Sequence, residues 1–341
     1  MNSLKREYYN PFFSHIYIEK EALSHPVTGR ILSSFPEARL IEISHYKEVF
    51  NRSRQNYRLQ KQAPSLILAQ MHQKLVYEGA PVCQNFGNQN FYYTSSVMNC
   101  IYDCEYCYLQ GMYPSANMVV FVNLEAVFEQ VEILLHKHPV YLCVSYDTDL
   151  LAMEHLLGYA KEWTGFALKH PALTIEIRTK SANLSVFERI TSCDNVILAW
   201  TLSPQKITES YEHHTPSLEQ RLTCIQTALQ KGYRVRLCFD PMIYCRDWKT
   251  EYEAMFSQVF AAINAEQLQD ASLGVFRAPQ DYMKKMRRQA RESDVLQFPF
   301  ENDKGVYHYS DSLTGEMIGF ASEQLKRKLA PEKIFIWDKT E

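Results

Sequence analysis

Apolar residues follow two periodicities along most of the chain. Short runs rich in β-branched and aromatic residues predict β-strands, and longer segments with apolar residues every three or four positions predict amphipathic helices. Strands are predicted at residues 90–97, 140–145, 173–178, 196–202, 233–239 and 273–276. Helices are predicted at residues 124–136, 150–168, 218–230, 252–263 and 280–291.

The repeated order of strand and helix predicts the fold class. Strands that alternate with helices form right-handed crossovers and therefore a parallel sheet. About six such repeats fit an open or partial barrel better than a closed eight-fold barrel. We therefore expect an α/β protein whose residues 91–300 form a partial (β/α)6 barrel.

The two ends of the chain depart from this alternation. Residues 1–90 are expected to form an N-terminal extension packed on the barrel, with a polar and basic stretch at 51–62 and helix-like apolar spacing at 64–75. No internal repeat and no linker rich in Pro, Gly or Ser is found, so one catalytic domain with terminal additions is the economical interpretation. The C-terminal addition, residues 301–341, is expected to contain half of a β-hairpin at 305–309, a helix at 312–329 and a closing strand at 334–337.

Composition narrows the class of protein. A chain of 341 residues with 46% hydrophobic and 22% charged residues is typical of a soluble globular protein with a large core. No apolar run reaches the roughly 18 residues of a membrane span, and the N-terminus has no apolar signal core, so we expect a cytoplasmic protein without a membrane partner. The net charge of −3 excludes a polycation that coats nucleic acid. Any DNA contact must come from a local basic face, and residues 282–291 form the densest basic segment.

Three of the nine cysteines form one cluster, Cys100-Ile-Tyr-Asp-Cys104-Glu-Tyr-Cys107, directly after a predicted strand. In a reducing compartment, clustered cysteines indicate metal or redox ligands rather than disulfides. A structural zinc site normally has a fourth ligand, for which Cys83 is a distant candidate. Three thiolates can instead hold a [4Fe–4S] cluster whose fourth iron stays open to a small molecule. We favour the open cluster, with zinc and metal-free cysteines as the alternatives.

The C-x3-C-x2-C spacing, with Tyr106 just before the third cysteine, resembles the radical S-adenosylmethionine enzymes. This resemblance implies S-adenosylmethionine as a second cofactor, chelated by the open iron and cleaved by an electron from the cluster to methionine and a 5′-deoxyadenosyl radical. It also implies a partial (β/α)6 barrel with the cluster loop after the first strand, which agrees with the pattern of predicted strands.

Further motifs resemble the spore photoproduct lyase family. They are Cys-Glu-Tyr-Cys-Tyr-Leu-Gln at 104–110, Arg-Thr-Lys at 178–180, Thr-Pro-Ser-Leu-Glu-Gln-Arg at 215–221, Gly-Tyr at 232–233 and Pro241. The resemblance implies a DNA repair lyase that reverses spore photoproduct, 5-thyminyl-5,6-dihydrothymine, to two thymines. The adenosyl radical removes a hydrogen atom from C6 of the lesion, and a protein cysteine returns one to the product radical. Ultraviolet-damaged DNA, a reductant such as flavodoxin or ferredoxin, and a monomeric state are expected with it.

Two residues are candidates for the hydrogen donor. The family carries Cys-x-Ser at the end of the second barrel strand, which Cys143 and Ser145 match with a short insertion behind them. An alternative alignment, anchored on residues 154–156, places Tyr146 in the donor position. We favour Cys143, because Ser145 and Lys180 then match the family with a single insertion.

The resemblance implies roles for further residues at the carboxyl ends of the strands, where barrels of this kind carry their active sites. Ser145, Lys180 and Thr201 would bind the polar parts of S-adenosylmethionine, and the compact cation of Lys180 suits its carboxylate. Tyr106 and Tyr108 would relay a hydrogen atom between the donor cysteine and the adenosine.

The lesion lies within a duplex and must be flipped out before chemistry, so the protein needs groups that support the extruded bases. Tyr307 and Tyr309 lie where the lyases have a supporting β-hairpin. Two other functions stay open: a divergent radical S-adenosylmethionine enzyme acting on another nucleic-acid lesion or a small molecule, and a non-catalytic zinc protein that binds nucleic acid. An iron–sulfur protein is brown, whereas zinc gives no colour.

Overall fold

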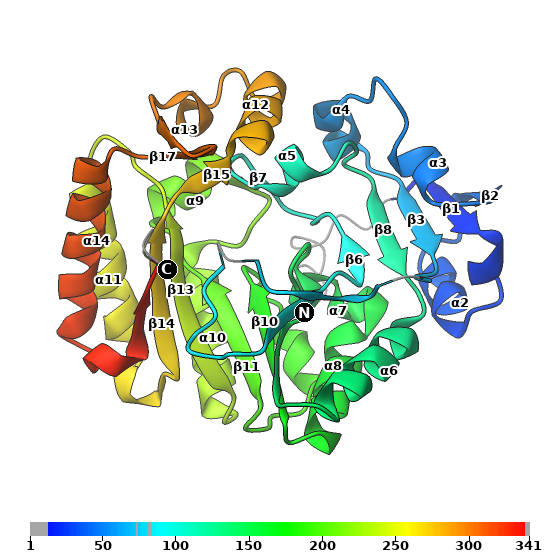
Figure 1. Cartoon of the computed structure of the whole chain (residues 1–341), viewed down its shortest axis with the longest axis horizontal. Helices are drawn as coiled ribbons and strands as arrows, with labels where there is room; N and C mark the ends of the chain where they lie inside the picture. Colours follow the sequence, from blue (N-terminus) through cyan, green and yellow to red (C-terminus); the bar gives the residue numbers. More distant parts are fainter. Residues whose placement is uncertain (1–12, 73, 81–82, 338–341) are drawn as a thin grey trace.

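The computed structural model describes residues 13–72, 74–80 and 83–337, and its larger sheet contains the predicted barrel strands (Figure 1). Six neighbouring strands pair in parallel and in chain order. Within the described residues this sheet stays open, because β18 (Ile334–Ile336) forms one edge and the antiparallel β4 (Val76–Glu78) the other. The expected partial α/β barrel is thus confirmed. The six strands are β5 (Phe91–Thr94), β9 (Val140–Cys143), β10 (Leu173–Thr179), β11 (Val196–Thr201), β13 (Arg234–Met242) and β14 (Asp270–Val275).

Helices connect these strands and cover the outside of the sheet. β11 reads as a continuous apolar run and is buried at every position, as is typical of a parallel strand that is covered on both faces. Figure 1 shows α11 and α14 beside β14, and α6 and α8 toward the other edge. These helices and their neighbour α10 are α6 (Leu124–Leu135), α8 (Tyr159–Lys169), α10 (Leu218–Gln230), α11 (Trp248–Ala262) and α14 (Asp311–Lys326).

The single helix predicted at 150–168 is two helices in the structure. Gly158 adopts a left-handed conformation with φ +70° and ends α7 (Leu150–Leu157), and α8 starts at the next residue. Glycine tolerates this conformation, which terminates a helix. Glu154 stabilises the junction, because its carboxylate accepts hydrogen bonds from the backbone N–H groups of Ala160 (2.8 Å) and Lys161 (3.2 Å). The apolar spacing continues across the break and therefore gave no sign of it.

A smaller five-stranded sheet lies beside the barrel and includes much of the N-terminal region. The helix predicted within 64–75 is wrong: Leu66–Ala69 forms β3, which is buried at all four positions between β1 and β8. A short apolar run cannot be assigned to helix or strand by periodicity alone. Two strands of this sheet lie beyond residue 90, and the division of the chain at that residue stays a prediction. The other strands, in sheet order, are β2 (Arg39–Ile43), β1 (His15–Glu19), β8 (Met118–Phe121) and β6 (Val97–Met98).

The C-terminal additions follow the prediction. The expected half of a hairpin is β17 (Val306–His308), which pairs antiparallel with β16 (Glu301–Asp303) and β15 (Arg277–Pro279). This small sheet lies with α12 (Gln280–Gln289) and α13 (Asp294–Gln297) at the top of Figure 1. The tail helix and the closing strand are α14 and β18.

Among the described residues, no helix has both the length and the hydrophobicity that crossing a membrane requires. The expectation that the protein lacks a signal sequence rests on its first residues, and residues 1–12 lie outside the described part of the chain.

A close helix crossing joins the cysteine loop to α12. A Cβ atom at Gly111, in α5 (Leu109–Met112), would lie 2.4 Å from Cβ and 2.5 Å from Cα of Tyr282 in α12. Overpacking of this kind typically costs about 1–3 kcal/mol. We expect Gly111→Ala to lower the free energy of unfolding by that amount in urea titrations. Gly319→Ala is the matched control, because open space surrounds that helical glycine and alanine there should stabilise by up to about 1 kcal/mol; equal effects of the two changes would contradict the prediction.

Candidate active site at the cysteine loop

The cysteine loop is held in place through its backbone. It follows β5, and its two-residue strand β7 (Asp103–Cys104) pairs antiparallel with β12 (Glu212–His213) from the connection after β11. The Lys61 ammonium donates hydrogen bonds to the carbonyl oxygens of Cys100 (2.7 Å) and Tyr102 (2.6 Å). The Gln110 amide donates to the carbonyl oxygen of Cys104 (2.7 Å). These contacts engage main-chain groups and leave the cysteine side chains available as ligands.

The three thiols lie close enough to act on one another. Burial raises the pKa of Cys104 well above its ordinary value; Lys180 opposes this shift, whereas Cys107 and Cys100 add to it. Three thiols in one short loop are the ligand set of a [4Fe–4S] cluster whose fourth iron stays open.

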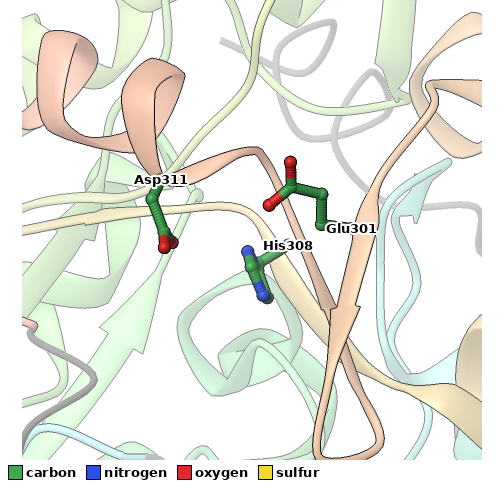
Figure 2. Close-up of side chains that lie close together, drawn as sticks. All are labelled: Glu301, His308 and Asp311. Carbon is green, nitrogen blue, oxygen red and sulfur yellow. The ribbon is translucent and has the colours of Figure 1, made fainter.

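A second set of potential ligands lies at the hairpin. Glu301, His308 and Asp311 point toward one another where β16, β17 and α14 meet, with ligand atoms within 4.8 Å of one another (Figure 2). His308 is buried, and its Nδ1 donates a hydrogen bond to the carbonyl oxygen of Tyr309 at 2.5 Å. Both carboxylates are exposed, and we assign this group to the polar rim of the hairpin.

Glu212, which sequence analysis did not identify, organises one side of the site. Its fully buried carboxylate accepts hydrogen bonds from Arg221 (2.5 Å), from Ser203 (2.8 Å) and from the Tyr106 hydroxyl. The Lys180 ammonium lies 4.0 Å from the same carboxylate and 5.6 Å from the centre of the Tyr106 ring. Burial raises the pKa of Glu212, but Arg221 and Lys180 outweigh that effect and lower it to about 2. Two buried cations, Arg221 and Lys180, thus share the single carboxylate of Glu212 beside Cys104.

Lys180 is positioned by its own backbone. Its N–H donates to Asp149 Oδ2 at 2.7 Å, and the hydroxyl of the preceding Thr179 donates to both oxygens of that carboxylate at 2.7 and 2.9 Å. Asp149 also accepts a hydrogen bond from the N–H of Ala152 and so caps the start of α7. The end of β10 is thereby fixed to the start of α7, and the Lys180 side chain projects toward the cysteine loop.

Tyr108, on the other side of the third cysteine, contacts the segment that follows β9. Its hydroxyl donates to the carbonyl oxygen of Tyr146 at 2.6 Å, and the two rings lie 6.0 Å apart. Asp147 accepts hydrogen bonds from Tyr113 (2.7 Å) and Ser95 (2.5 Å). Burial raises the pKa of Asp147, although these hydroxyl groups oppose the shift. Tyr106 and Tyr108 thus face different partners: Glu212 and Lys180 for the first, Tyr146 and Asp147 for the second.

The two residues predicted at the end of β9 lie in a tightly bonded corner. Cys143 is buried at the end of β9, and burial raises the pKa of its thiol. The Ser145 hydroxyl accepts from the N–H of Arg178 (2.6 Å) and donates to the carbonyl oxygen of Arg178 (3.0 Å), which ties β9 to β10. Contact of Ser145 with S-adenosylmethionine, and hydrogen donation by Cys143, stay predictions.

The other predicted site residues differ in exposure. Thr201 is buried at the end of β11, and its carbonyl oxygen accepts a hydrogen bond from Arg221 at 3.1 Å. Tyr307 is half-buried in β17, beneath the Arg287 guanidinium at 5.1 Å. Tyr309 is only 1% exposed and packs on Phe298. It therefore supports the hairpin from within, and the expectation of a lesion contact rests on Tyr307.

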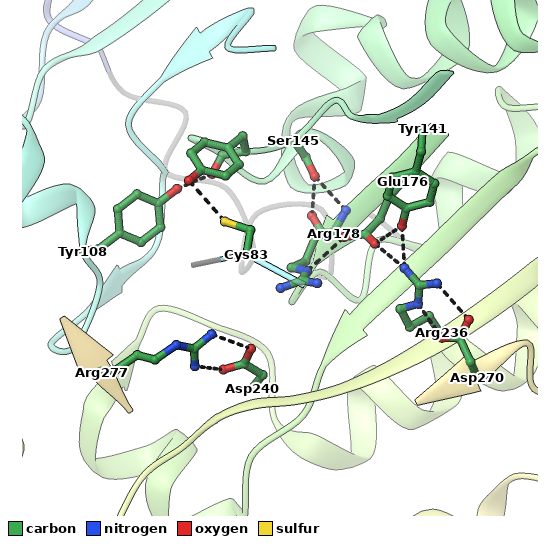
Figure 3. A network of polar contacts seen from close by, with 11 residues as sticks. Cys83, Tyr108, Tyr141, Ser145, Glu176, Arg178, Arg236, Asp240, Asp270 and Arg277 are labelled. Atoms are coloured by element: carbon green, nitrogen blue, oxygen red, sulfur yellow. Dashed lines mark hydrogen bonds and ion pairs between the residues drawn. The ribbon is translucent and has the colours of Figure 1, made fainter. Parts of the chain in front are cut away.

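A buried polar network crosses the sheet beside the site (Figure 3). The Arg236 guanidinium donates to Glu176 (2.5 Å) and to both oxygens of Asp270, and the Tyr141 hydroxyl lies within 2.5 Å of it. Its planar group also lies 3.2 Å from the centre of the Phe86 ring. Because a buried cation is costly unless it is paired, we assign this network to the stability of the sheet.

Comparisons with known proteins agree with this geometry. The family model described as spore photoproduct lyase matches residues 12–292. A spore photoproduct lyase of Clostridium acetobutylicum is 22% identical over 267 residues, which cover 75% of this chain and 76% of the relative.

Solved structures share the fold. A variant spore photoproduct lyase with dinucleoside spore photoproduct superimposes with a TM-score of 0.78 and 17% identity, covering 96% of this chain and 98% of that chain. A double variant with bound AdoMet and dinucleoside spore photoproduct gives 0.77 and 18%, covering 96% and 99%. The family match spans most of the chain and includes the three-cysteine loop, and the chain therefore belongs to the spore photoproduct lyase family.

Proposed function

We propose that this protein is a radical S-adenosylmethionine DNA repair lyase that directly reverses spore photoproduct to two thymines. The observation that carries the proposal is the family match over residues 12–292. The site geometry supports it, because the three-cysteine loop lies beside a buried Lys180–Glu212 pair at the carboxyl ends of the barrel strands. Spore photoproduct lyases have been solved with dinucleoside spore photoproduct bound.

The residues of the loop fit a [4Fe–4S] cluster and S-adenosylmethionine. Cys100, Cys104 and Cys107 would hold the cluster, with carbonyl groups of the loop fixed by Lys61 and Gln110. When bound, these two cofactors supply a 5′-deoxyadenosyl radical. The chain's own residues position the reactants, exclude water and return a hydrogen atom.

Lys180 suits the carboxylate of S-adenosylmethionine. Its ammonium is largely buried, and its nearest anion, Glu212, is shared with Arg221 and Tyr106. Burial lowers the pKa of Lys180, but Glu212 outweighs this and raises it, so the ammonium keeps its charge. A charged group held at 4.0 Å from its partner still has donors for a second carboxylate.

DNA contact is expected on the basic face of α12. Met283 and Met286 are buried beneath the helix, whereas Lys284, Lys285 and Arg288 are exposed on it. The same helix packs on α5, directly after the third cysteine. Phosphates bound to these three cations would therefore lie close to the cysteine loop, although the whole chain is slightly acidic.

A triple variant tests this surface. We expect Lys284→Ala, Lys285→Ala and Arg288→Ala together to weaken binding of duplex DNA and to lower the slope of log affinity against log salt by about 2–3, because roughly one counterion is released per phosphate contact. Turnover of the isolated dinucleotide lesion should be unchanged. The exposed lysines of α14 and its end, Lys326 and Lys328, provide a matched control. An unchanged salt slope would contradict the assignment.

The partners follow from the chemistry. The cluster needs an electron, which we assign to a reducing protein such as flavodoxin or ferredoxin. We expect a monomer that acts on ultraviolet-damaged DNA in the cytoplasm. The hydrogen atom returned to the product comes from a protein Cys or Tyr, with Cys143 and Tyr146 as the candidates.

The direct test is an anaerobic assay. The reconstituted enzyme is incubated with dithionite, S-adenosylmethionine and dinucleotide spore photoproduct, and the products are separated by chromatography. Release of intact thymidylyl-thymidine is the expected result. Formation of 5′-deoxyadenosine with the lesion untouched would contradict the proposed substrate and favour a divergent radical enzyme.

A further inference from the structure

The basic segment at residues 51–62 has no part in the reaction described so far. It carries four cations and no carboxylate, in a chain whose net charge is −3. It consists of a loop followed by α4 (Tyr57–Gln62). In Figure 1, α4 and α12 lie at the same end of the molecule, on either side of α5. The cysteine loop leads into α5 and therefore has the helix expected to contact DNA on one side and this basic segment on the other.

The inner face of α4 lies against the cysteine loop. The Tyr57 hydroxyl donates a hydrogen bond to Asn99 Oδ1 at 3.5 Å, directly before Cys100 in the chain. One helical turn later, the Lys61 ammonium donates to the carbonyl oxygen of Cys100 at 2.7 Å. Burial chiefly raises the pKa of Tyr57, and Cys107 and Cys100 add to the shift, as nearby groups do. The helix thus contacts the segment that carries the cysteine ligands.

The outer face of the segment combines positive charge with an exposed apolar side chain. Arg52, Arg54 and Arg58 are all exposed. Leu59 is 61% exposed, the highest value among the large hydrophobic residues that the structure describes. A single exposed leucine is ordinary on a protein surface, but a leucine beside arginines has the apolar centre and charged surroundings of a protein interface. We call the exposed side chains of residues 52–59 the α4 face.

We propose that the α4 face docks the acidic reducing protein that delivers an electron to the iron–sulfur cluster. This inference rests on the proposed function, because that reaction needs a reduced cluster. One electron leaves the reduced flavin or iron–sulfur centre of the partner and enters the cluster that Cys100, Cys104 and Cys107 would hold. No bond forms or breaks in this step, and the partner is left oxidised by one electron.

The position and the size of the α4 face fit a redox partner. Electron transfer slows steeply with distance, so the partner must dock close to the cluster, and α4 contacts the loop directly. Electron-transfer encounters often bury less than about 1,200 Å² in total, which a short helix and its preceding loop can supply. Cations on this face attract an acidic partner and speed its association. DNA bound to α12 would lie on the other side of α5 and would leave the α4 face open.

The test removes two cations from the α4 face without disturbing the fold. Arg54 has φ +60°, a left-handed conformation that glycine adopts without strain, so Arg54→Gly removes the side chain and leaves the backbone as it is. This change is combined with Arg58→Ala, at an exposed position of α4. Leu59→Ala probes the apolar contact alone. Lys326→Ala with Lys328→Ala removes the same charge from exposed positions at the end of α14 and is the matched control.

The probes are an acidic flavodoxin and an acidic ferredoxin, and their binding is measured by fluorescence anisotropy in the oxidised state, which needs no turnover. We expect Arg54→Gly with Arg58→Ala to weaken binding on the order of tenfold at low salt, and the difference to shrink as salt screens the exposed charges. Leu59→Ala should weaken binding by about threefold at every salt concentration, because salt does not screen an apolar contact. The control variant should bind as the wild type does.

A second readout uses the source of the electron. Repair of the dinucleotide lesion with photoreduced flavodoxin should slow in both α4-face variants. Repair with dithionite should proceed at the wild-type rate, because this small reductant needs no docking face. Affinity for duplex DNA should also stay at the wild-type value, which distinguishes the α4 face from the basic face of α12.

The outcomes separate this inference from the proposed function. If neither probe binds the wild type, or if the double variant binds them as tightly as the wild type does, the inference is overturned even where the lesion is repaired. If the double variant loses affinity for duplex DNA and keeps its affinity for the probes, the α4 face is a second DNA contact and the inference is overturned as well. If the α4 face binds the probes but the wild type leaves the lesion intact with dithionite, the proposed function fails and the docking face stands.

Discussion

Cys104→Ala is expected to abolish the iron–sulfur cluster and all lesion repair. Cys104 is the most enclosed of the three loop cysteines, and its strand β7 is fixed by pairing with β12. A loop with two thiols cannot replace the third ligand, because each cysteine would bind a separate iron. The reconstituted variant should be colourless, with neither 5′-deoxyadenosine nor thymidine products.

Cys224→Ala provides the matched control for this result. Cys224 is also a buried cysteine, but it lies in α10, outside the cysteine loop. We expect that variant to keep the brown colour and the activity. A Cys104→Ala protein that still holds iron and cleaves S-adenosylmethionine would show that the loop is not the cluster site.

Glu212→Gln is expected to be the most destabilising single change at the site. The carboxylate is fully buried, with Arg221 at 2.5 Å and Lys180 at 4.0 Å. Breaking a buried ion pair leaves uncompensated charge in the interior and typically costs about 3–5 kcal/mol. We expect a loss of this size in urea denaturation, together with weaker binding of S-adenosylmethionine, because Lys180 and Tyr106 lose their common partner.

The control for Glu212 lies on the preceding helix. Glu209 is exposed in α9 (Gln205–Tyr211), and its carboxylate accepts a hydrogen bond from Gln205 at 2.8 Å. Glu209→Gln should change the free energy of unfolding by less than about 0.5 kcal/mol. If the two substitutions lowered the free energy of unfolding by similar amounts, the prediction that Glu212 stabilises the site would be wrong.

The ionisation of Glu212 is expected to make the stability of the folded protein depend on pH. Folding lowers the pKa of Glu212 from an ordinary value of 4.5 to about 2, against the opposing effect of burial. A carboxyl group whose pKa is lower in the folded than in the unfolded protein stabilises the fold at pH values above its pKa in the unfolded chain. This stabilisation is lost as the pH falls from about 4.5 toward 2. The stabilisation amounts to roughly 3 kcal/mol. When unfolding is measured across this pH range, the free energy of unfolding of Glu212→Gln should depend less on pH than that of the wild type.

Sequence reasoning worked where one physical signal dominated. The continuous apolar run of β11 and the β-branched and apolar residues of β10 and β13 marked these three strands closely. The cysteine spacing identified the loop, because ligand chemistry demands those residues at short separation. The capping box of Ser217 and Gln220 likewise lies at the start of the helix predicted at 218–230.

The site residues that sequence analysis missed are placed by contacts between segments far apart in the chain. Glu212 meets Arg221 and Lys180 only because β12 pairs with the cysteine loop, and no local pattern distinguishes it from an exposed glutamate. Cys83 and Tyr146 are brought together by the pairing of β5 with β9 in the same sheet. Tyr309 was expected to face the lesion, but its place in the hairpin directs it into the core.

The most direct measurement follows a single atom. The enzyme is incubated anaerobically with S-adenosylmethionine, a reductant and dinucleotide spore photoproduct that carries deuterium at C6 of the lesion. We expect deuterium to appear in 5′-deoxyadenosine while intact thymidylyl-thymidine is released. Repair without deuterium in 5′-deoxyadenosine, or unlabelled 5′-deoxyadenosine with the lesion unchanged, would contradict it.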